Sequence, residues 1–314
     1  MRVLVLGGTG FIGRHAAAAL LRRGHQVRIA TRHPRRARRA LPPALAACPL
    51  LEARLEWLIT PHEWCRAVRE VDVVVNAVGI LRERGRWETY ERLHCEAPAA
   101  LAAACAKLGV RLVHVSALGL DEMAQSRFLL SKLAGERAVA ASGADYSLVR
   151  PALLDGEGGF GATWLRRVAR WPVHFVPSDA RGRLSVLDVR DLGEAIAVLC
   201  EERNNPRWRE VELGGAAEVT LGELLAALRA RTEEKPALRI KVPAFLAQLA
   251  SHLCDLTHLT PFSFGHLELM RKDNVPQANL LPRLIGREST PLRLVGRERE
   301  ILDPAPVALR WPAL

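Results

Sequence analysis

Three glycines near the start of the chain have the spacing of phosphate-binding glycines. Gly7, Gly10 and Gly13 form the pattern G-x-x-G-x-x-G directly after the apolar run Arg2–Leu6, where a helical pattern begins. Gly7 permits a tight turn, Gly10 lets the backbone approach a pyrophosphate at the helix N-terminus, and Gly13 allows close packing on the strand. The placement predicts a dinucleotide site. Its loop contacts are assigned to Gly7, Thr9, Gly10, Phe11, Ile12 and Gly13.

The end of the second predicted strand distinguishes the two nicotinamide dinucleotides. An NAD site usually has an acidic residue there, about 20 residues after the glycines, which binds the ribose 2′-hydroxyl. Here the run is ATRHPRR (30–36), and no carboxylate occurs before Glu52. Arg32 and Arg36 are placed for a 2′-phosphate, which a guanidinium binds through charge-assisted hydrogen bonds. The sequence therefore favours NADP(H) over NAD(H).

The charge of the chain is concentrated in this same segment. The 314 residues include 45 Lys+Arg and 34 Asp+Glu, a formal net charge of +11. The first 51 residues hold ten arginines and no acidic residue, so the remainder is nearly balanced, with 35 basic and 34 acidic groups. A nucleic-acid-binding protein usually spreads its basic residues over a face or a tail. The local excess argues against nucleic acid, although a general preference for arginine explains Arg38 and Arg39 equally well.

The composition excludes several other classes of protein. At 49% hydrophobic and 25% charged residues, it is typical of a soluble globular protein. The six cysteines show no CxxC or CxxH pairing, so we expect no metal site, no disulfide framework and a reducing cytoplasm. The glycines interrupt the N-terminal apolar run too early for a signal peptide. No apolar run of about 18 residues occurs, so we expect no transmembrane segment.

Strands and helices alternate through the first half of the chain. Strands are expected at 2–6, 26–31, 54–59, 71–78, 111–116 and 146–150, and helices at 11–23, 98–108 and 131–141. This order predicts an α/β fold with a doubly wound, Rossmann-type parallel sheet and a smaller C-terminal α/β region. We divide the chain into a dinucleotide-binding core (1–155) and a mixed region (156–314). In that region 183–231 rejoins the sheet and 236–314 forms a substrate or partner lobe.

One segment of that lobe is apolar and amphipathic. Residues 242–259 suit a core helix, a partner-binding helix or a membrane-surface helix. Their few charges favour packing against the chain itself.

Several short motifs resemble those of the short-chain dehydrogenase/reductase superfamily, in its extended or atypical branch. The finer match is to the bacterial relatives of the NADPH-binding accessory subunit of respiratory complex I. The resemblance covers nearly the whole chain, and is specific in the first 155 residues and loose after 235. It implies that Ala77, Val78, Gly79, Ser116, Lys132 and Pro151 contact the dinucleotide. The motifs are NAVG (76–79), VSALG (115–119), SKLAGE (131–136), VRP (149–151) and DNV (273–275).

The resemblance fails at one catalytic position. Members of the superfamily use a Tyr-x-x-x-Lys pair on one helix face, with the Tyr as general acid or base and a Ser that polarises the substrate oxygen. Here Ser116 and Lys132 match, but the Tyr position is Phe128, which transfers no proton. The only two tyrosines, Tyr90 and Tyr146, are not spaced for the role.

A second departure lies after the predicted third strand. Relatives carry Gly-Asp-Leu there, with the Asp reaching the adenine amino group, whereas this chain has Glu56-Trp57-Leu58. Leu58 remains a predicted cofactor contact. Trp57 either covers the adenine or packs, and we favour packing.

Other polar residues are given structural roles. His94 lies on a helix that the resemblance places behind the cofactor. Asp188 and Asp191 are expected to cap a helix and form ion pairs. The loop 155–159 is expected to border the nicotinamide end.

Two functions follow. The first is an NADP(H)-binding protein that is weakly or non-catalytic, uses the cofactor as a structural or sensing ligand, and acts through a partner. The alternative is an NADP-dependent oxidoreductase or epimerase/dehydratase with an altered proton donor, namely Ser116, Lys132 through water, or a substrate group. A protein partner, a small-molecule substrate and peripheral contact with the inner membrane are left open.

Overall fold

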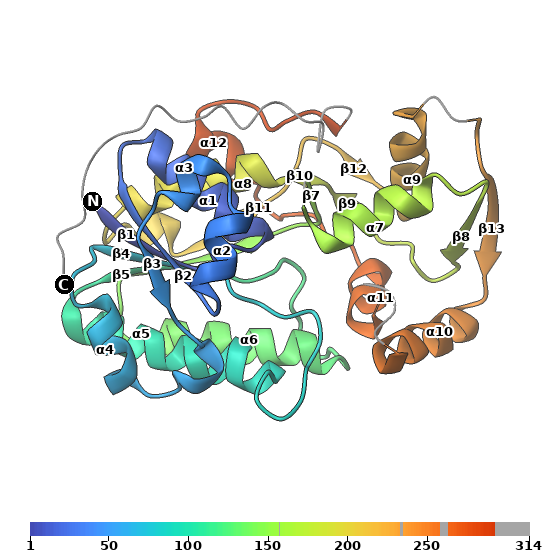
Figure 1. The fold of residues 1–314 in the computed structure, drawn as a ribbon. Helices are drawn as coiled ribbons and strands as arrows, with labels where there is room; N and C mark the ends of the chain where they lie inside the picture. The colour runs from blue at the N-terminus through green and yellow to red at the C-terminus, as the bar shows by residue number, and fades with distance from the viewer. Residues whose placement is uncertain (157, 233–234, 258–262, 293–314) are drawn as a thin grey trace.

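A seven-stranded parallel sheet forms the centre of the computed structural model, which describes residues 1–156, 158–232, 235–257 and 263–292. The strand order is β11-β6-β5-β4-β1-β2-β3, with every neighbouring pair parallel (Figure 1). The predicted Rossmann-type sheet is therefore confirmed. The strands are β1 (Arg2–Leu6), β2 (Gln26–Thr31), β3 (Leu50–Glu52), β4 (Val73–Asn76), β5 (Arg111–Val115), β6 (Tyr146–Pro151) and β11 (Glu210–Leu213).

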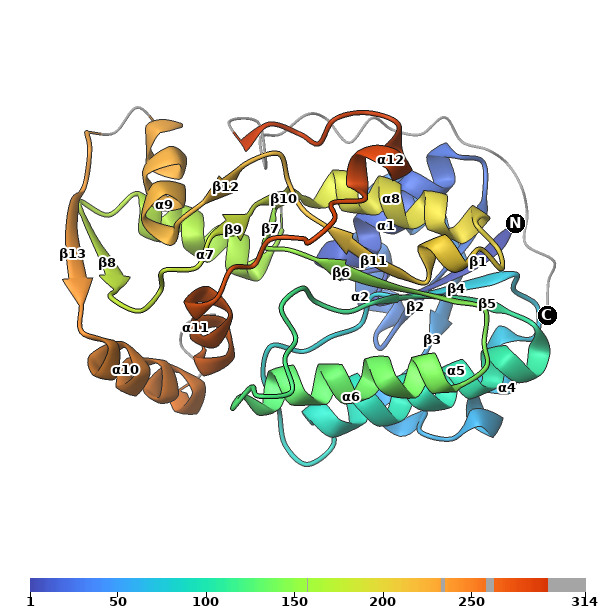
Figure 2. The ribbon, with the colours of Figure 1, turned by 180° about the vertical axis from the view of Figure 1, so that it is seen from behind.

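Helices cover both faces of this sheet. In β1, Val3 and Val5 face one core and Leu4 and Leu6 face the other, because successive side chains of a strand point to opposite sides. Burial on both faces explains why the strands are nearly continuous runs of valine and leucine. Figures 1 and 2 show the two layers. The first comprises α1 (Phe11–Arg22), α3 (Pro43–Ala46), α8 (Val189–Glu201) and α12 (Leu281–Ile285), and the second α4 (Pro61–Val68), α5 (Ala97–Leu108) and α6 (Arg127–Ala141).

The expected third strand at 54–59 is wrong. The chain pairs with β2 earlier, at β3, and Ala53 makes the last backbone hydrogen bond to Thr31. It then leaves the sheet in a 3-10 turn, Leu55–Trp57, because β2 offers no further backbone to pair with. The apolar residues of 54–59 therefore belong to a turn and its flanks and not to a strand. Leu55 is buried, and the carbonyl of Leu58 accepts a hydrogen bond from the indole of Trp64.

Helices and short two-stranded sheets lie beyond one end of the parallel sheet (Figures 1 and 2). We call the following six elements the C-terminal lobe: α7 (Phe160–Ala169), β8 (Val173–Pro177), α9 (Leu221–Ala230), β13 (Leu238–Val242), α10 (Ala244–Thr257) and α11 (Phe264–Arg271). Strands β8 and β13 pair in parallel. Two smaller pairs connect the lobe to the sheet: β7 (Leu154–Asp155) with β10 (Leu187–Asp188), and β9 (Leu184–Ser185) with β12 (Glu218–Val219).

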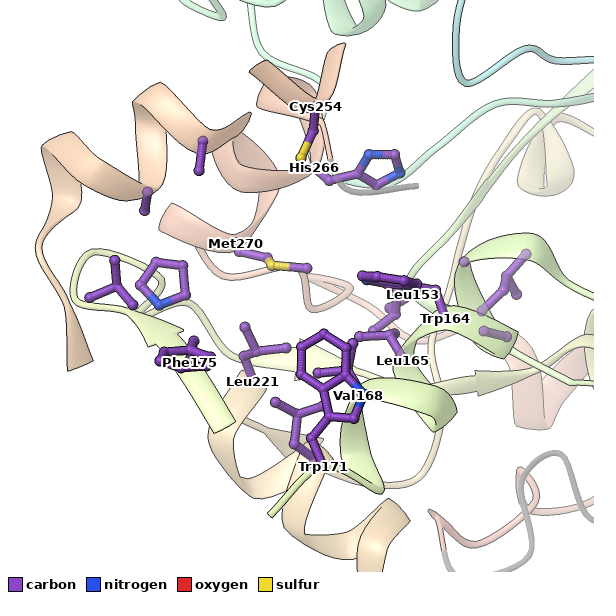
Figure 3. A pocket seen from close by; sticks show the side chains of 18 residues that line it. Leu153, Trp164, Leu165, Val168, Trp171, Phe175, Leu221, Cys254, His266 and Met270 are labelled. Atoms are coloured by element: carbon purple, nitrogen blue, oxygen red, sulfur yellow. The ribbon is translucent and has the colours of Figure 1, made fainter. Parts of the chain in front are cut away.

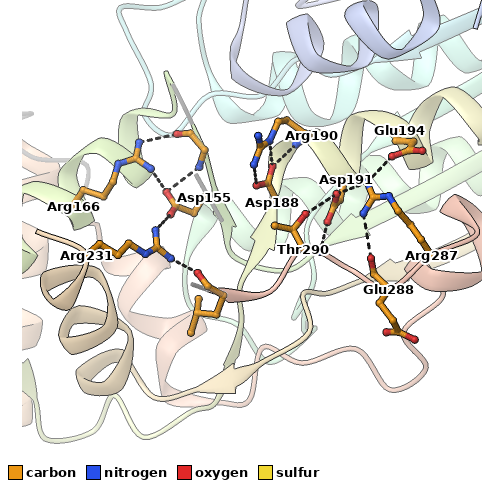
Figure 4. Close-up of polar contacts among 12 residues, drawn as sticks. Asp155, Arg166, Asp188, Arg190, Asp191, Glu194, Arg231, Arg287, Glu288 and Thr290 are labelled. Atoms are coloured by element: carbon orange, nitrogen blue, oxygen red, sulfur yellow. Dashed lines mark hydrogen bonds and ion pairs between the residues drawn. The ribbon is translucent and has the colours of Figure 1, made fainter. Parts of the chain in front are cut away.

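Carboxylates fix the connections between these parts (Figure 4). Asp188 accepts a hydrogen bond from the backbone N–H of Arg190 and so caps α8, while its side chain also binds the Arg190 guanidinium. Asp191 binds Arg287 and Thr290, which ties the chain after α12 to α8. Both aspartates therefore have the capping and ion-pairing roles expected from the sequence.

Helix α10 departs from the expectation for the apolar segment 242–259. One face is buried, at Ala247 and Ser251, but five large apolar side chains lie exposed on the rest of the helix. Packing against the chain itself is thus correct for only one face. Residues 258 and 259 lie outside the described residues. The exposed side chains are Phe245, Leu246, Leu249, Leu253 and Leu256.

No helix in the described part of the chain is both long enough and apolar enough to cross a membrane. All six cysteines fall within the described residues, and their side chains are free thiols. The same residues contain no group of three or more His, Cys, Asp and Glu side chains that could hold a metal ion.

Candidate dinucleotide site

Four predicted site positions follow four adjacent parallel strands. The register places Leu6 opposite Asn76, Asn76 opposite His114, and Val115 opposite Val149. The carboxyl ends of these strands therefore meet at one edge of the sheet, which is where ligands bind in open α/β folds. The positions brought together are Gly7 after β1, Ala77 after β4, Ser116 after β5 and Pro151 at the end of β6.

The glycine loop has the geometry of a phosphate cradle. Gly7 has φ +72°, a left-handed conformation that favours glycine, and its carbonyl accepts a 2.8 Å hydrogen bond from the Gly10 N–H. A Cβ on Gly13 would overlap the Gly7 carbonyl oxygen, so α1 packs against the loop only because Gly13 lacks a side chain. A Cβ on Gly10 would meet only that oxygen, at 3.1 Å, and would otherwise fill open space. The loop therefore fits a pyrophosphate.

The electrostatics of this end of α1 also suit an anion. The first turn contains no acidic residue, and the helix N-terminus carries a partial positive charge. Thr9 is exposed beside the cradle, and Phe11 and Ile12 are half-buried. Phe11 and Ile12 form the first turn of α1 directly after the loop, so their role as cofactor contacts stays a prediction.

The glycine-rich loop after β7 lies against the same turn of α1. A Cβ on Gly159 would approach the Phe11 ring at 2.8 Å, and one on Gly158 would overlap the guanidinium of Arg14. Asp155 at the start of the loop binds Arg166 and lies 3.6 Å from Arg231 (Figure 4). We expected this loop to border the nicotinamide end of the site. Its glycines instead contact the first turn of α1, next to the glycine loop that would hold the phosphates.

The end of β2 has a carboxylate that the local sequence does not reveal. Arg32 forms an ion pair with Glu88, with 2.5 Å between Nη1 and Oε1. Glu88 is 56 residues further along the chain, so no local motif indicates that it reaches this position. Arg36 is exposed nearby. Arg32 therefore has to exchange or share its partner before it can bind a 2′-phosphate.

Trp57 does not pack into the core. Its side chain is 52% exposed, and the Arg54 guanidinium lies over the ring, 4.7 Å from the centroid. The expectation of packing is wrong because the 3-10 turn directs Trp57 outwards. Leu58, the neighbouring predicted contact, is half-buried.

Ser116 has a buried hydroxyl with no hydrogen-bond partner among the described residues. Its backbone N–H donates to Val149, and two residues later Leu118 donates to Pro151, so the loop after β5 follows β6 closely. Buried polar groups are nearly always hydrogen-bonded in folded proteins. The Ser116 Oγ is therefore available to a bound molecule.

Lys132 lies beside the loop after β4. A Cβ on Gly79 would be 3.6 Å from its Nζ. Burial lowers the pKa of Lys132 to about 8, while the charge of Glu136 opposes this shift. Glu136 is itself held by the Arg150 guanidinium, with 2.6 Å between Nη2 and Oε2. With a pKa of about 8, Lys132 keeps its charge in most molecules at pH 7 and loses it as the pH rises through 8.

The ring of Phe128 occupies the position where the superfamily has its Tyr, one helical turn before Lys132. It is buried and surrounded by three rings, those of Tyr90, His94 and His266, with centroid distances of 5.7, 5.6 and 6.0 Å. The Lys132 Nζ is 5.9 Å from the Phe128 centroid. A packed phenyl ring therefore stands at this position, and it has no group that could transfer a proton.

His94 is locked in a structural role. Ser131 donates its hydroxyl proton to the Phe128 carbonyl, so it accepts from the His94 Nδ1–H at 3.0 Å. The other ring nitrogen, Nε2, accepts from the N–H of Ile80 at 3.1 Å. Burial holds the pKa of His94 well below its ordinary value. The neutral ring therefore has no spare proton to donate.

The other two rings around Phe128 were not indicated by the sequence. The hydroxyl of Tyr90 donates to the Leu81 carbonyl at 2.9 Å, and burial raises its pKa to about 12. His266 comes from α11, and burial lowers its pKa to about 4. Neither residue belongs to a motif, and α11 falls in the part of the chain where the resemblance is loose.

The comparisons with known proteins agree with this geometry. A family model described as "NAD dependent epimerase/dehydratase family" matches residues 3–214. Ceramide reductase from Caulobacter vibrioides (strain NA1000 / CB15N) is 28% identical over 229 residues, which cover 68% of this chain and 69% of the relative. Subunit 9 of the mitochondrial NADH dehydrogenase (ubiquinone) 1 alpha subcomplex from Arabidopsis thaliana is 25% identical over 279 residues, covering 86% and 68%. The resemblance to the complex I subunit is thereby confirmed.

Solved structures support the fold. An NADPH-dependent quinone oxidoreductase from Escherichia coli aligns with a TM-score of 0.67 at 18% identity, covering 93% of this chain and 97% of that one. The structure of MoeE5 in complex with UDP-glucose and NAD aligns with a TM-score of 0.66 at 18% identity, covering 94% and 96%. At this identity the likeness extends to the fold alone.

Proposed function

Because the chain belongs to the NAD-dependent epimerase/dehydratase family, we propose that it binds NADP(H) and catalyses carbonyl chemistry weakly or not at all. The observation that carries this proposal is Phe128, packed among three rings above an intact cofactor loop. The bound dinucleotide then has a structural or sensing role, exerted through a partner protein in the cytoplasm or at the inner membrane. Gly7, Gly10 and Gly13 would hold the pyrophosphate, and Lys132 the nicotinamide ribose.

A second function is favoured by the buried hydroxyl of Ser116. A carbonyl that accepts a hydride also needs one proton, and the superfamily's Ser polarises that carbonyl oxygen. Ser116 Oγ has no partner among the described residues, and Lys132, with its pKa lowered to about 8, can release a proton near neutral pH. The alternative is thus a slow NADP-dependent reductase or epimerase. Two of the similar proteins are named as a ceramide reductase and as an NADPH-dependent quinone oxidoreductase.

Titration of the purified protein with the four dinucleotides tests the cofactor assignment. We expect NADP(H) to bind more tightly than NAD(H) by calorimetry, because Arg32 and Arg36 would lie near a 2′-phosphate and no carboxylate follows β2 in the local sequence. Replacing Glu88 by Gln removes the ion-pair partner of Arg32. This variant should strengthen NADPH binding several-fold and leave NADH binding unchanged. Tighter binding of NADH to the unmodified protein would refute the assignment.

A Phe128→Tyr substitution distinguishes the two functions. Under the proposal, the unmodified protein binds NADPH and turns over a carbonyl substrate weakly or not at all, and the added hydroxyl beside Lys132 raises that activity. Tyr90→Phe is the matched control, because Tyr90 also packs on Phe128 but donates its hydroxyl to a backbone carbonyl. Steady NADPH oxidation by the unmodified protein, abolished in Ser116→Ala, would establish the alternative.

A further inference from the structure

The C-terminal lobe contains an apolar cavity of about 320 Å³ that is partly open to solvent. Its walls come from α7, β8, α9, α10 and α11, together with the chain after β6. Figure 3 shows the side chains pointing into it from these separate elements. The larger ones include Leu153, Trp164, Trp171, Phe175, Leu221 and Met270.

The cavity presents no charge to an occupant. Among the described residues its lining includes no Asp, Glu, Lys or Arg. The one titratable ring, His266, has its pKa lowered to about 4 by burial and binds Ser263 through Nδ1, so it is neutral at physiological pH. Water gains few hydrogen bonds in such a space, and apolar cavities of this kind bind apolar molecules. The volume lies at the lower end of the range for ligand pockets, about 300–1,000 Å³.

One end of the cavity adjoins the candidate dinucleotide site. His266 lines the cavity and also stacks on Phe128, with 6.0 Å between the ring centroids. Leu153 lines it as well, two residues after Pro151 at the end of β6. A molecule in the cavity therefore lies next to the position where the superfamily transfers protons.

Helix α10 forms another of the cavity walls, and it is apolar on two faces. Its small residues Ala247, Ala250 and Cys254 line the cavity. Its large residues lie outside, where Leu249 is 66% and Leu256 is 78% exposed. A helix that is apolar around most of its surface normally lies within a core or in a membrane. Contiguous exposed apolar surface likewise marks an interaction site.

Basic residues border this outer surface. Strand β13 leads directly into α10, and all of Leu238, Arg239, Ile240 and Lys241 are exposed. Because successive side chains of a strand point to opposite sides, Leu238 and Ile240 form an apolar row on β13, and Arg239 and Lys241 form a basic row along its other side. Apolar groups that enter the acyl boundary and cations near them that contact headgroups suit an anionic lipid surface. This arrangement favours a bilayer over a protein as the neighbour of α10.

We propose that the cavity binds the hydrocarbon chain of an amphiphilic lipid, taken up from a bilayer on which the outer face of α10 lies. This inference goes beyond the proposed function and does not depend on dinucleotide binding. The polar end of the lipid would lie at the mouth of the cavity, and the chain among the residues of α7, β8 and α9.

A chain-length series tests the cavity. Linear fatty alcohols, each kept below its solubility limit and without nucleotide, compete with a fluorescent acyl probe. Each added methylene should tighten binding about fourfold until the cavity is full. Ala162→Phe and Ala247→Phe reduce the space from two different walls and should each weaken binding at least tenfold, with thermal unfolding as the check that each variant folds. Affinity independent of chain length, or unchanged in the folded variants, would overturn the proposal.

Vesicles test the source of the lipid. We expect the protein to sediment with phosphatidylcholine vesicles that contain phosphatidylglycerol, and less with phosphatidylcholine alone. A Leu249→Ser, Leu256→Ser double variant should lose sedimentation and slow probe transfer from vesicles, while its affinity for the dissolved alcohols stays unchanged. Arg239→Gln with Lys241→Gln should remove the preference for the anionic lipid. If the unmodified protein binds the alcohols but ignores vesicles, or if α10 instead joins two copies into a dimer, the bilayer as source is refuted.

Discussion

The parallel sheet region and the C-terminal lobe solve the burial of apolar residues differently. In the sheet region, the core strands are buried on both faces and two helical layers cover them. In the lobe, two-stranded sheets and single helices leave apolar surface uncovered. Of the 17 large hydrophobic side chains that are exposed in the described residues, ten lie between Phe160 and Leu256. The first region is built around a polar loop that fits a charged ligand, and the second around apolar space that fits an uncharged one.

The comparison predicts that a buried ion pair in the sheet region matters greatly to folding. Arg150 on β6 holds Glu136 on α6, whose side chain is almost fully buried. Arg150→Ala leaves that carboxylate without its partner and should lower the free energy of unfolding by about 3–5 kcal/mol. Arg137→Ala, on the same helix, removes an exposed pair with Glu122 and should cost about 0–1 kcal/mol. Denaturant unfolding measures both. Equal losses would mean that the burial of Glu136 does not make its ion pair matter more than the exposed pair.

A second pair of variants compares one glycine from each region. In Gly13→Ala the new Cβ overlaps the Gly7 carbonyl, so α1 has to move away from the loop. We expect a loss of about 1–3 kcal/mol in stability and the loss of dinucleotide binding by calorimetry. Gly161→Ala, in α7 of the lobe, meets no atom within 4 Å. It should change stability by no more than about 1 kcal/mol and leave dinucleotide binding intact. Retained binding in Gly13→Ala would place the cofactor elsewhere.

The same contrast explains what the sequence could predict. The β1–α1–β2 unit was predictable because its strands are buried apolar runs and its glycines have required spacings. These are local signals, as is the capping of α8 by Asp188. The third strand was misplaced because its position depends on where the neighbouring strand β2 stops offering backbone partners, which composition does not reveal.

Features that depend on distant segments were invisible to sequence reasoning. Glu88 reaches Arg32 across 56 residues, and His266 reaches Phe128 across 138. The cavity collects its lining from residues between Leu153 and Met270, and apart from His266 none of them stands out in the sequence. The segment 242–259 is a further example. Its apolar pattern predicts a helix, but the pattern does not tell which face of the helix packs against the chain and which face stays exposed.

The smallest expected effect concerns two titratable groups, one on each side of the boundary between the regions. Burial lowers the pKa of Lys132 to about 8 and that of His266, in the lobe, to about 4. Between about pH 7 and pH 9 the folded state therefore loses the Lys132 proton, while the unfolded chain, with a lysine pKa of about 10.4, keeps it. The unfolded state binds more protons, so stability rises with pH, by about 1 kcal/mol over this range. His266 is neutral in the folded state, and the unfolded chain protonates it only in part at pH 7, so it contributes little there.

Unfolding measured at both pH values isolates this contribution. Lys132→Met should abolish the rise, whereas Lys107→Met, which changes an exposed lysine at the end of α5, should preserve it. A bound dinucleotide that contacts the ammonium would favour its charged form and raise the pKa of Lys132, so saturating NADPH should move the rise to higher pH. If NADPH binds but leaves the pH dependence unchanged, the nicotinamide ribose does not reach Lys132. In that case the dinucleotide would be held at the glycine loop but not at Lys132.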